Sequence, residues 1–254
     1  MHPVLFSIFG HEIRVYGLMV AMAFLTGLTL SSMAAKKKGI NPDVILDLGL
    51  VIIISSVVGA RALYVGVWWS YYANHVIDIF KVWEGGLVYY GGFIGALAGA
   101  FAWIHYKKLN LHEIGDIMMP YLALAHAIGR IGCYYNACCY GAVNDKFGVI
   151  FPALNDNLRH LPTQLYESVL NFLNFVFLAL FYKNKKRLEG DVFYAYFLNY
   201  GIIRFTLEQF RGDPERGFIF GISTSMFISI FLAASGIAGL VMLRLRKLKV
   251  TIQK

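Results

Sequence analysis

The chain has 254 residues, of which 58% are hydrophobic and only 15% are charged. Soluble domains carry nearer a quarter of charged residues, so this composition excludes an ordinary soluble protein and predicts an integral membrane protein. The net charge of +8 is explained by loop residues that set topology and contact anionic lipid head groups, and it gives no support to nucleic-acid binding.

Seven stretches are long enough to cross a hydrocarbon core about 30 Å thick, which needs about 20 residues of helix. In chain order they are residues 15–35, 44–60, 87–106, 114–135, 163–182, 192–210 and 221–243. We therefore predict an all-α, polytopic membrane protein with about seven transmembrane helices and a single domain over residues 1–254. The start of the chain lacks a basic region and a small-residue cleavage site, so we expect no cleavable signal peptide.

Lysine and arginine are divided unequally between alternate loops, and short basic loops stay on the cytoplasmic side. Residues 36–38, 107–108, 183–187 and the tail from Arg244 together hold 14 basic residues, whereas the alternate loops hold 7. We predict that the N-terminus is outside and the C-terminus is cytoplasmic. Arg130 and Arg204 are left within the membrane or at its outer edge.

Charged side chains gather in the outer parts of two predicted spans. His126 lies one turn before Arg130, and Tyr200, Arg204 and Glu208 recur at every fourth residue. This spacing puts side chains on one helix face, where Arg204 and Glu208 can pair. An arginine near the centre of a spanning helix costs about 2.5–3.5 kcal/mol on insertion scales, so such residues indicate a functional site.

A third span adds Gln164 and Glu167, on adjacent turns at the same outer level, and Arg211 follows Glu208 by three residues. One interpretation is structural: an internal Arg204–Glu208 pair braces a bundle while Arg130 reaches the head groups. We favour a cavity that binds an anion, because arginine donates paired hydrogen bonds to phosphate. In a membrane, the expected phosphate is that of a phospholipid.

Glycines and cysteines mark two further segments. Gly95 and Gly99 are typical of close helix packing, whereas the pairs at 85–86 and 91–92 stand at the mouth of a span, where backbone could approach a ligand. The three cysteines, Cys133, Cys138 and Cys139, lack the second ligand pair of a zinc site. We favour buried packing residues over a disulfide, and both over a metal or catalytic cysteine. The sequence implies no metal or organic cofactor.

Five motifs in order resemble those of the prolipoprotein diacylglyceryl transferase family, which are bacterial inner-membrane enzymes. The motifs are IRVYGLMVA, GGLVYYGGFIG, GRIGCYYNACCYG, LPTQLYE and YGIIRFTLEQFRGDP, and together they cover nearly the whole chain. The resemblance implies transfer of a diacylglyceryl group from phosphatidylglycerol to the lipobox cysteine of a preprolipoprotein. It implies multi-pass insertion in the bacterial cytoplasmic (inner) membrane, with phosphatidylglycerol, preprolipoprotein signal peptides and membrane lipids as partners.

The resemblance also assigns roles to residues. Arg130 and Arg204 would handle the phosphate of the donor lipid, and Glu208 would position Arg204. The substrate cavity would be lined or supported by Tyr16, Gly91, Gly92, Asn136, Gly141, Gln164, Glu167, Tyr200 and Arg211.

Two residues depart from the family pattern, and the first of them concerns the catalytic base. Tyr90 stands where many members have the histidine often proposed as base, and Cys133 stands where they have asparagine. Our hypothesis is that His126 abstracts the proton and that Tyr90 donates or relays a hydrogen bond. A helix-packing role is the alternative for His126. His160 is a second candidate base, although Leu161 separates it from the following proline.

These departures keep other functions open. A diverged paralogue could use the same phospholipid pocket with another acceptor, or with none. A phospholipid-binding membrane transporter is a different class, but the charges sit at one depth and no repeat pair with broken helices is evident. A seven-helix receptor would share only the number of spans.

Overall fold

The computed structural model describes residues 4–8, 11–184, 188–213, 217–219 and 221–252. Four helices are long and apolar enough to cross a membrane: α1 (Val15–Lys37), α2 (Pro42–Val67), α6 (Thr163–Tyr182) and the part Thr224–Lys249 of α8 (Thr224–Ile252). The chain is therefore a membrane protein. Five residues counted in the predicted orientation lie outside the described residues: Lys185, Lys186, Arg187, Arg216 and Lys254.

Three more helices coincide with the remaining predicted spans. These are α4 (Tyr89–Tyr106), α5 (Leu111–Tyr135) and α7 (Asp191–Glu208). They fall outside the four apolar helices because α5 and α7 carry charged residues, and because α4 is rich in glycine and tyrosine. Length and apolar composition thus support four spans, and the number seven stays a prediction.

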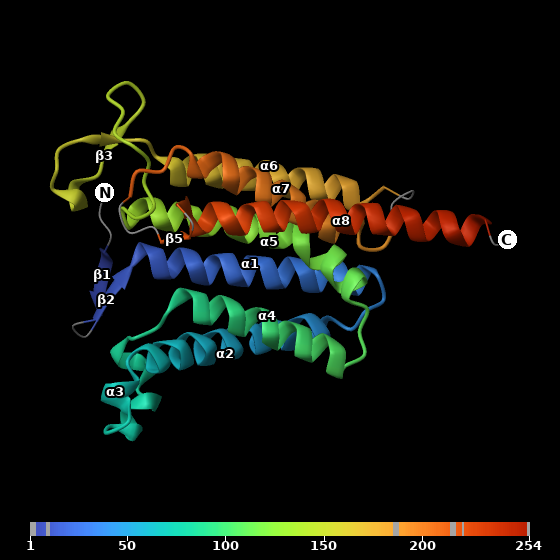
Figure 1. Cartoon of the computed structure of the whole chain (residues 1–254), viewed down its shortest axis with the longest axis horizontal. Coiled ribbons are helices and arrows are strands. Elements are labelled where there is room, and N and C mark those ends of the chain that lie inside the picture. Colours follow the sequence, from blue (N-terminus) through green and yellow to red (C-terminus); the bar gives the residue numbers. More distant parts are fainter. Residues whose placement is uncertain (1–3, 9–10, 185–187, 214–216, 220, 253–254) are drawn as a thin grey trace. The chain divides into compact units, whose positions relative to one another are not determined.

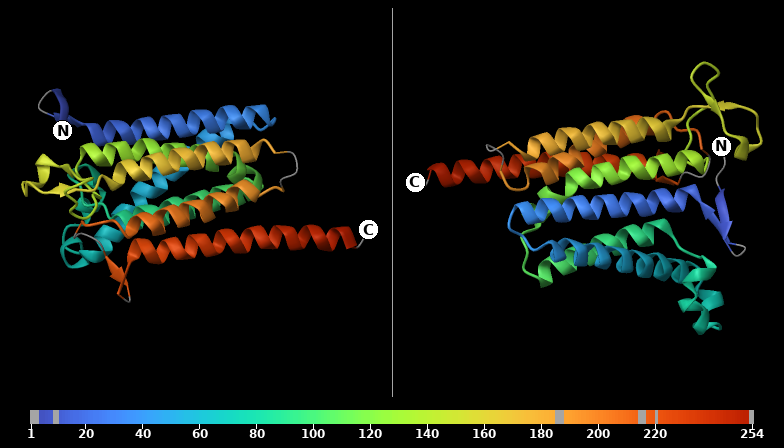
Figure 2. Two further views of the ribbon diagram at one scale, coloured as in Figure 1. Left: turned by 90° about the horizontal axis from the view of Figure 1, so that it is seen from above. Right: turned by 180° about the vertical axis from the view of Figure 1, so that it is seen from behind.

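The fold is mostly helical, and the expectation of a purely α-helical chain missed three short antiparallel hairpins. The hairpins pair β1 (Val4–Ile8) with β2 (His11–Arg14), β3 (Val149–Ile150) with β4 (Arg159–His160), and β5 (Phe218–Ile219) with β6 (Ile222–Ser223). They lie at the same end of the helices α5 to α8 (Figures 1 and 2). The strands β3 to β6 have two residues each, too few for alternation to reveal them in a sequence.

The chain divides into two compact units, one made of Ser32–Leu111 and the other of Met1–Ser31 with His112–Lys254. In the first of these, which we call the α2–α4 unit, α2 packs along α4. Side chains added at Gly59 or Gly91 would collide with the backbone of the opposite helix, so these glycines allow the two helices to approach closely.

The α2–α4 unit also contains the link between its two helices. This link comprises α3 (Trp69–Tyr72) and two 3-10 helices, η1 (Val76–Phe80) and η2 (Val82–Glu84). Arg61 of α2 is buried and donates hydrogen bonds to the carbonyl oxygens of Asp78, Ile79, Gly85 and Gly86. Its guanidinium carbon lies 5.7 Å from the ring centre of Tyr64 and 5.3 Å from that of Tyr72.

The other unit, which we call the α5–α8 unit, packs α6 against α7 and α7 against α8. Its apolar core is built from Ala123, Leu178, Val192, Ala195 and Tyr196. At the start of α7, the buried carboxylate of Asp116 accepts hydrogen bonds from the backbone N–H groups of Gly190 and Phe193, both at 2.9 Å. These bonds satisfy amides that a helix N-terminus leaves without partners, and they attach α5 to α7.

Candidate active site

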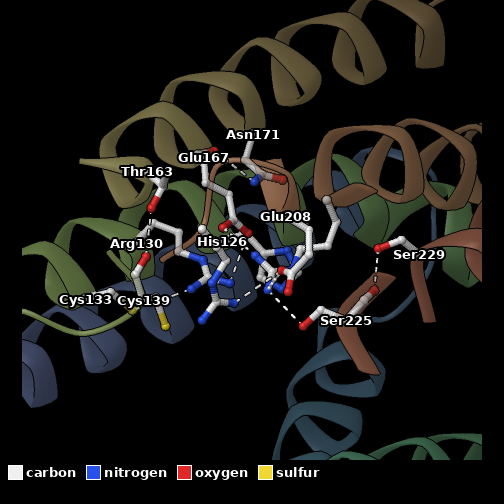
Figure 3. A network of polar contacts seen from close by, with 12 residues as sticks. His126, Arg130, Cys133, Cys139, Thr163, Glu167, Asn171, Glu208, Ser225 and Ser229 are labelled. Carbon is white, nitrogen blue, oxygen red and sulfur yellow. Dashed lines mark hydrogen bonds and ion pairs between the residues drawn. The ribbon is translucent and has the colours of Figure 1, made fainter. Parts of the chain in front are cut away.

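Three helices of the α5–α8 unit meet at one carboxylate (Figure 3). Glu167 of α6 binds Arg130 of α5 through Oε1, at 3.0 Å from Nη2, and Arg204 of α7 through Oε2, at 3.3 Å from Nη1. The Glu167 side chain is only 5% exposed and that of Arg204 10%. These three helices bring their polar side chains together, and Glu167 is the residue that joins them.

The network continues from Arg204 to the end of α7 and into the segment after it, with charges of alternating sign. Arg204 also pairs with Glu208, at 2.9 Å, as the four-residue spacing predicted. Glu208 lies 3.6 Å from Arg211, which holds Asp213 through two hydrogen bonds from its guanidinium. Three arginines and three carboxylates therefore form one connected network, in which each buried charge has a partner of opposite sign.

The segment after α5 is fixed to the start of α6 by backbone and side-chain contacts. Gln164 donates from Nε2 to the carbonyl oxygen of Cys138 at 2.7 Å, and Thr163 donates from Oγ1 to that of Cys139 at 2.8 Å. Gly141 donates to the Leu161 carbonyl oxygen at 2.8 Å and forms a bridge with Arg211. A side chain at Gly141 would collide with Leu161, so glycine is required for this close approach.

Two tyrosine side chains of α7 contact His126, which lies one turn before Arg130. Its Nδ1 lies 3.0 Å from the hydroxyl of Tyr196, and its ring centre lies 5.0 Å from that of Tyr200. Tyr196 and Tyr200 stack with ring centres 5.7 Å apart. His126 is thus packed between α5 and α7, one turn from Arg130, with one ring nitrogen engaged.

The three cysteines are free thiols, so the disulfide that the sequence left open does not form in this structure. Cys133 has its Sγ 3.9 Å from Nη1 of Arg130, and its carbonyl oxygen lies 3.6 Å from the Sγ of Cys138. Within the described ranges, no group of three or more His, Cys, Asp or Glu side chains is arranged to hold a metal ion.

Comparison with known proteins identifies the family. The sequence profile described as "Prolipoprotein diacylglyceryl transferase" matches residues 3–242. The chain belongs to this family. Relatives named phosphatidylglycerol–prolipoprotein diacylglyceryl transferase match over almost their full length.

The chain is 37% identical to the protein of this name from Clostridium tetani over 244 residues, which is 93% of this chain and 96% of the relative. It is 36% identical to a protein from Clostridium perfringens that is named phosphatidylglycerol–prolipoprotein diacylglyceryl transferase 2, over 98% of this chain and 97% of the relative. The relative from Finegoldia magna is 34% identical, over 93% and 94% respectively. The resemblance read from the five motifs is therefore confirmed at the level of the family.

The resemblance to prolipoprotein diacylglyceryl transferases predicted several site residues in the α5–α8 unit, and the structure divides them into two groups. The structure joins Arg130, Glu167, Arg204, Glu208 and Arg211 in one network, with Gln164, Gly141 and Tyr200 beside it. Tyr16 is half exposed where α1 passes close to Gly132, and Asn136 is exposed after the end of α5. Their roles stay predictions.

Tyr90, Gly91 and Gly92 belong to the α2–α4 unit. Tyr90 is 42% exposed. Gly91 and Gly92 are buried against α2, facing Gly59 and Ser56 respectively. Helix packing accounts for these two glycines in the structure, and their predicted contact with substrate stays a prediction.

His160, the second candidate base, is buried in the hairpin segment. Its Nδ1 lies 3.2 Å from the carbonyl oxygen of Gly141, and its Nε2 lies 2.8 Å from the Asp156 carboxylate. Both ring nitrogens are engaged, so the contacts give His160 a role in holding the Gly141 segment. The backbone N–H of Leu158 and the imidazole of His160 hold the pKa of the Asp156 carboxyl below its ordinary value.

Two residues that contact the arginines, Ser225 and Asp213, were not singled out from the sequence. Ser225 of α8 accepts a hydrogen bond from Nη2 of Arg204 at 2.9 Å, and Asp213 binds Arg211. Asp213 could have been found, because it follows Arg211 by two residues in a charged loop. Ser225 could not, since its contact depends on how α8 packs against α7.

Proposed function

We propose that this chain transfers the diacylglyceryl group of phosphatidylglycerol to the lipobox cysteine of preprolipoproteins, forming a thioether and releasing glycerol phosphate. The observation that carries the proposal is the pair of arginines, Arg130 and Arg204, held on two helices by one carboxylate. Its support also includes family membership and the names of the relatives.

The chemistry requires an alkyl transfer. The acceptor thiol, whose ordinary pKa is about 8.5, must lose its proton before sulfur attacks the glyceryl carbon. The C–O bond to phosphate breaks, and glycerol phosphate leaves with the electron pair. Arg130 and Arg204 are suited to stabilise the charge that develops on this leaving group, because a guanidinium stays charged and donates hydrogen bonds in pairs. The reacting cysteine belongs to the substrate.

We further propose seven transmembrane helices, with the N-terminus outside and the C-terminus cytoplasmic, in the bacterial cytoplasmic membrane. The basic loops support this orientation. The hairpins and the arginine network would then lie toward the outer side, where the signal peptide of an exported preprolipoprotein presents its lipobox.

The test is reconstitution. Purified protein is incubated with phosphatidylglycerol and a lipobox peptide, and both glycerol phosphate release and peptide mass are measured. The proposal expects the peptide to gain one diacylglyceryl group, and it expects Arg130→Ala and Arg204→Ala to slow this reaction strongly. If phosphatidylglycerol stays intact where an authentic transferase consumes it, the proposal is wrong, and Tyr90 and Cys133 then indicate a paralogue with another acceptor or a lipid carrier. Binding of phosphatidylglycerol without consumption would favour the carrier.

A further inference from the structure

Glu167 contacts the two arginines that the proposed function assigns to the phosphate. Both of its carboxylate oxygens are engaged, one by Arg130 and one by Arg204, and its side chain is almost completely buried. A phosphate that accepts hydrogen bonds from Nη2 of Arg130 and Nη1 of Arg204 competes with this carboxylate for the same donors. Under the proposed function, a phosphate bound in this way changes the partners of Glu167.

The two arginines differ in what they keep after such an exchange. Arg204 retains Glu208 and the hydroxyl of Ser225, both through Nη2. Among the described residues, Glu167 is the carboxylate that lies within 4.0 Å of the Arg130 guanidinium. The phosphate thus replaces the carboxylate partner of Arg130, while Arg204 stays anchored to α7 and α8.

A carboxylate released in this way is a buried anion without a counter-ion. The charged groups that face Glu167 are Arg130 from α5 and Arg204 from α7, with His126 also close enough on α5 to interact electrostatically. Once the singly charged phosphodiester pairs with Arg130 while Glu208 stays paired with Arg204, burial disfavours the ionised Glu167 carboxylate. Binding a proton removes this cost. The proton available in the complex is that of the acceptor thiol.

We propose that Glu167 is the catalytic base, uncovered when the phosphate of the donor lipid displaces it from Arg130 and Arg204. In the step, the S–H bond breaks and the proton passes to a Glu167 oxygen. Sulfur bonds to the glyceryl carbon while the C–O bond to phosphate breaks, and the electron pair leaves with glycerol phosphate. Glu167 then gives its proton to the departing phosphate or to water and pairs again with the arginines. No other reactant is needed.

The contacts favour Glu167 over His126 for this role. His126 shares its Nδ1 with the Tyr196 hydroxyl and packs against Tyr200. Glu208 is a less suitable base, because Arg211, which the proposed function does not assign to the phosphate, still pairs with it when the lipid is bound. Glu167 is the carboxylate shared by the two arginines that the proposed function assigns to the phosphate.

The test compares Glu167→Gln with Glu208→Gln, a matched change at the other buried carboxylate of the network. Glu167→Gln is expected to lower kcat by about 100- to 10,000-fold, the usual contribution of a general base. Its affinity for phosphatidylglycerol, measured by binding to the purified variant, is expected to stay equal or to rise, because the competing carboxylate is gone. Raising the pH above about 8.5 ionises the thiol directly and is expected to recover part of the Glu167→Gln rate but not of the Glu208→Gln rate.

Several results would overturn the proposal. One is a Glu167→Gln variant that transfers the diacylglyceryl group as fast as the unmodified protein. Another is a Glu167→Gln variant that loses both phosphatidylglycerol binding and activity, because this result indicates that Glu167 only holds the two arginines in place. Alkaline recovery in His126→Gln, with none in Glu167→Gln, would transfer the role to His126. If Glu167→Gln does not fold, Glu167→Asp keeps a base and is expected to retain transfer, so an inactive, folded Glu167→Asp that binds the lipid contradicts the proposal. Absence of transfer by the unmodified protein would instead refute the proposed function itself.

Discussion

Arg130 and Arg204 sit in similar surroundings but depend on their partners differently. Arg204 is held by Glu167, Glu208 and Ser225, whereas Arg130 relies on Glu167 and on a distant thiol contact with Cys133. Arg130 is also more exposed, at 21% of its side chain against 10%. Arg130 is therefore the more available of the two for a ligand, and Arg204 is the more firmly placed.

This difference predicts distinct effects of lysine substitution. Arg130→Ala is expected to lower the rate of transfer by about 100- to 1,000-fold, as for loss of one stabilising donor to a transition state. Arg130→Lys keeps the charge but not the paired donors, so an intermediate rate is expected. Arg204→Lys is expected to lower thermal stability as well, because Glu208 and Ser225 lose a shared donor. Glycerol phosphate release and thermal unfolding in detergent measure the two effects, and equal stability of both lysine variants would contradict this account.

The Asp156–His160 contact predicts a pH effect in the hairpin segment. Because the folded-state pKa of Asp156 is lowered, its contribution to stability is present above the ordinary value of about 3.9 and is lost as the pH falls through the folded value. Asp156→Asn should remove this dependence and loosen the segment before α6 at neutral pH. Hydrogen exchange of residues 142–160 as a function of pH checks the prediction; unchanged protection in the variant would refute it.

At the scale of elements, Arg61 acts as a clamp on the link between α2 and α4. Its guanidinium satisfies four backbone carbonyl oxygens that belong to η1 and to the Gly85–Gly86 turn. Arg61→Gln leaves most of these oxygens without a donor, and a buried group left unsatisfied costs about 1–3 kcal/mol. We expect destabilisation of at least about 2 kcal/mol, seen as a lower Tm and as faster hydrogen exchange in residues 76–88. An unaltered Tm would show that the link does not depend on this residue.

The α2–α4 packing gives a second prediction with a control in the same helix pair. A methyl group at Gly95 would collide with the backbone of Ser55, whereas one at Gly66 meets nothing within 4 Å. Gly95→Ala is expected to cost about 1–3 kcal/mol through overpacking, and Gly66→Ala is expected to be neutral or slightly stabilising. Unfolding of both variants in detergent measures the difference. Equal stability would mean that the helices separate easily at this point.

The sequence predicts a contact within one helix more readily than a contact between helices. The Arg204–Glu208 pair follows from helical spacing alone, and it was predicted. The double contact of Glu167 was not, because it depends on how α5, α6 and α7 pack, which no local pattern encodes. The same reason explains Gly91 and Gly92: the sequence placed two glycines at the mouth of a helix, but only the structure shows α2 lying against them.

For the whole molecule, the topology is the prediction that most needs a direct measurement. Composition supports four spans in the described part of the chain, and the seven-span arrangement depends on α4, α5 and α7 crossing as well. These three helices are less apolar because they carry glycines or the charges of the network, so their mean hydropathy is lower than that of the other four. We expect a fluorescent reporter that folds only in the cytoplasm to be active when fused after Lys254 and inactive when inserted between Asn144 and Asp156. The opposite pattern would reverse the proposed orientation.

The alternating network also bears on how the protein is made. Arg130, Glu167 and Arg204 lie on three successive helices, so Arg130 leaves the ribosome before Glu167, the carboxylate that pairs with it. At about 5–20 residues per second, Glu167 follows Arg130 by roughly two to seven seconds. If α5 crosses the bilayer as proposed, an unpaired arginine in lipid is costly over that interval, so α5 is expected to remain beside the insertion machinery until α6 has arrived. The residues that hold the site together would thereby also fix the order in which its helices enter the bilayer.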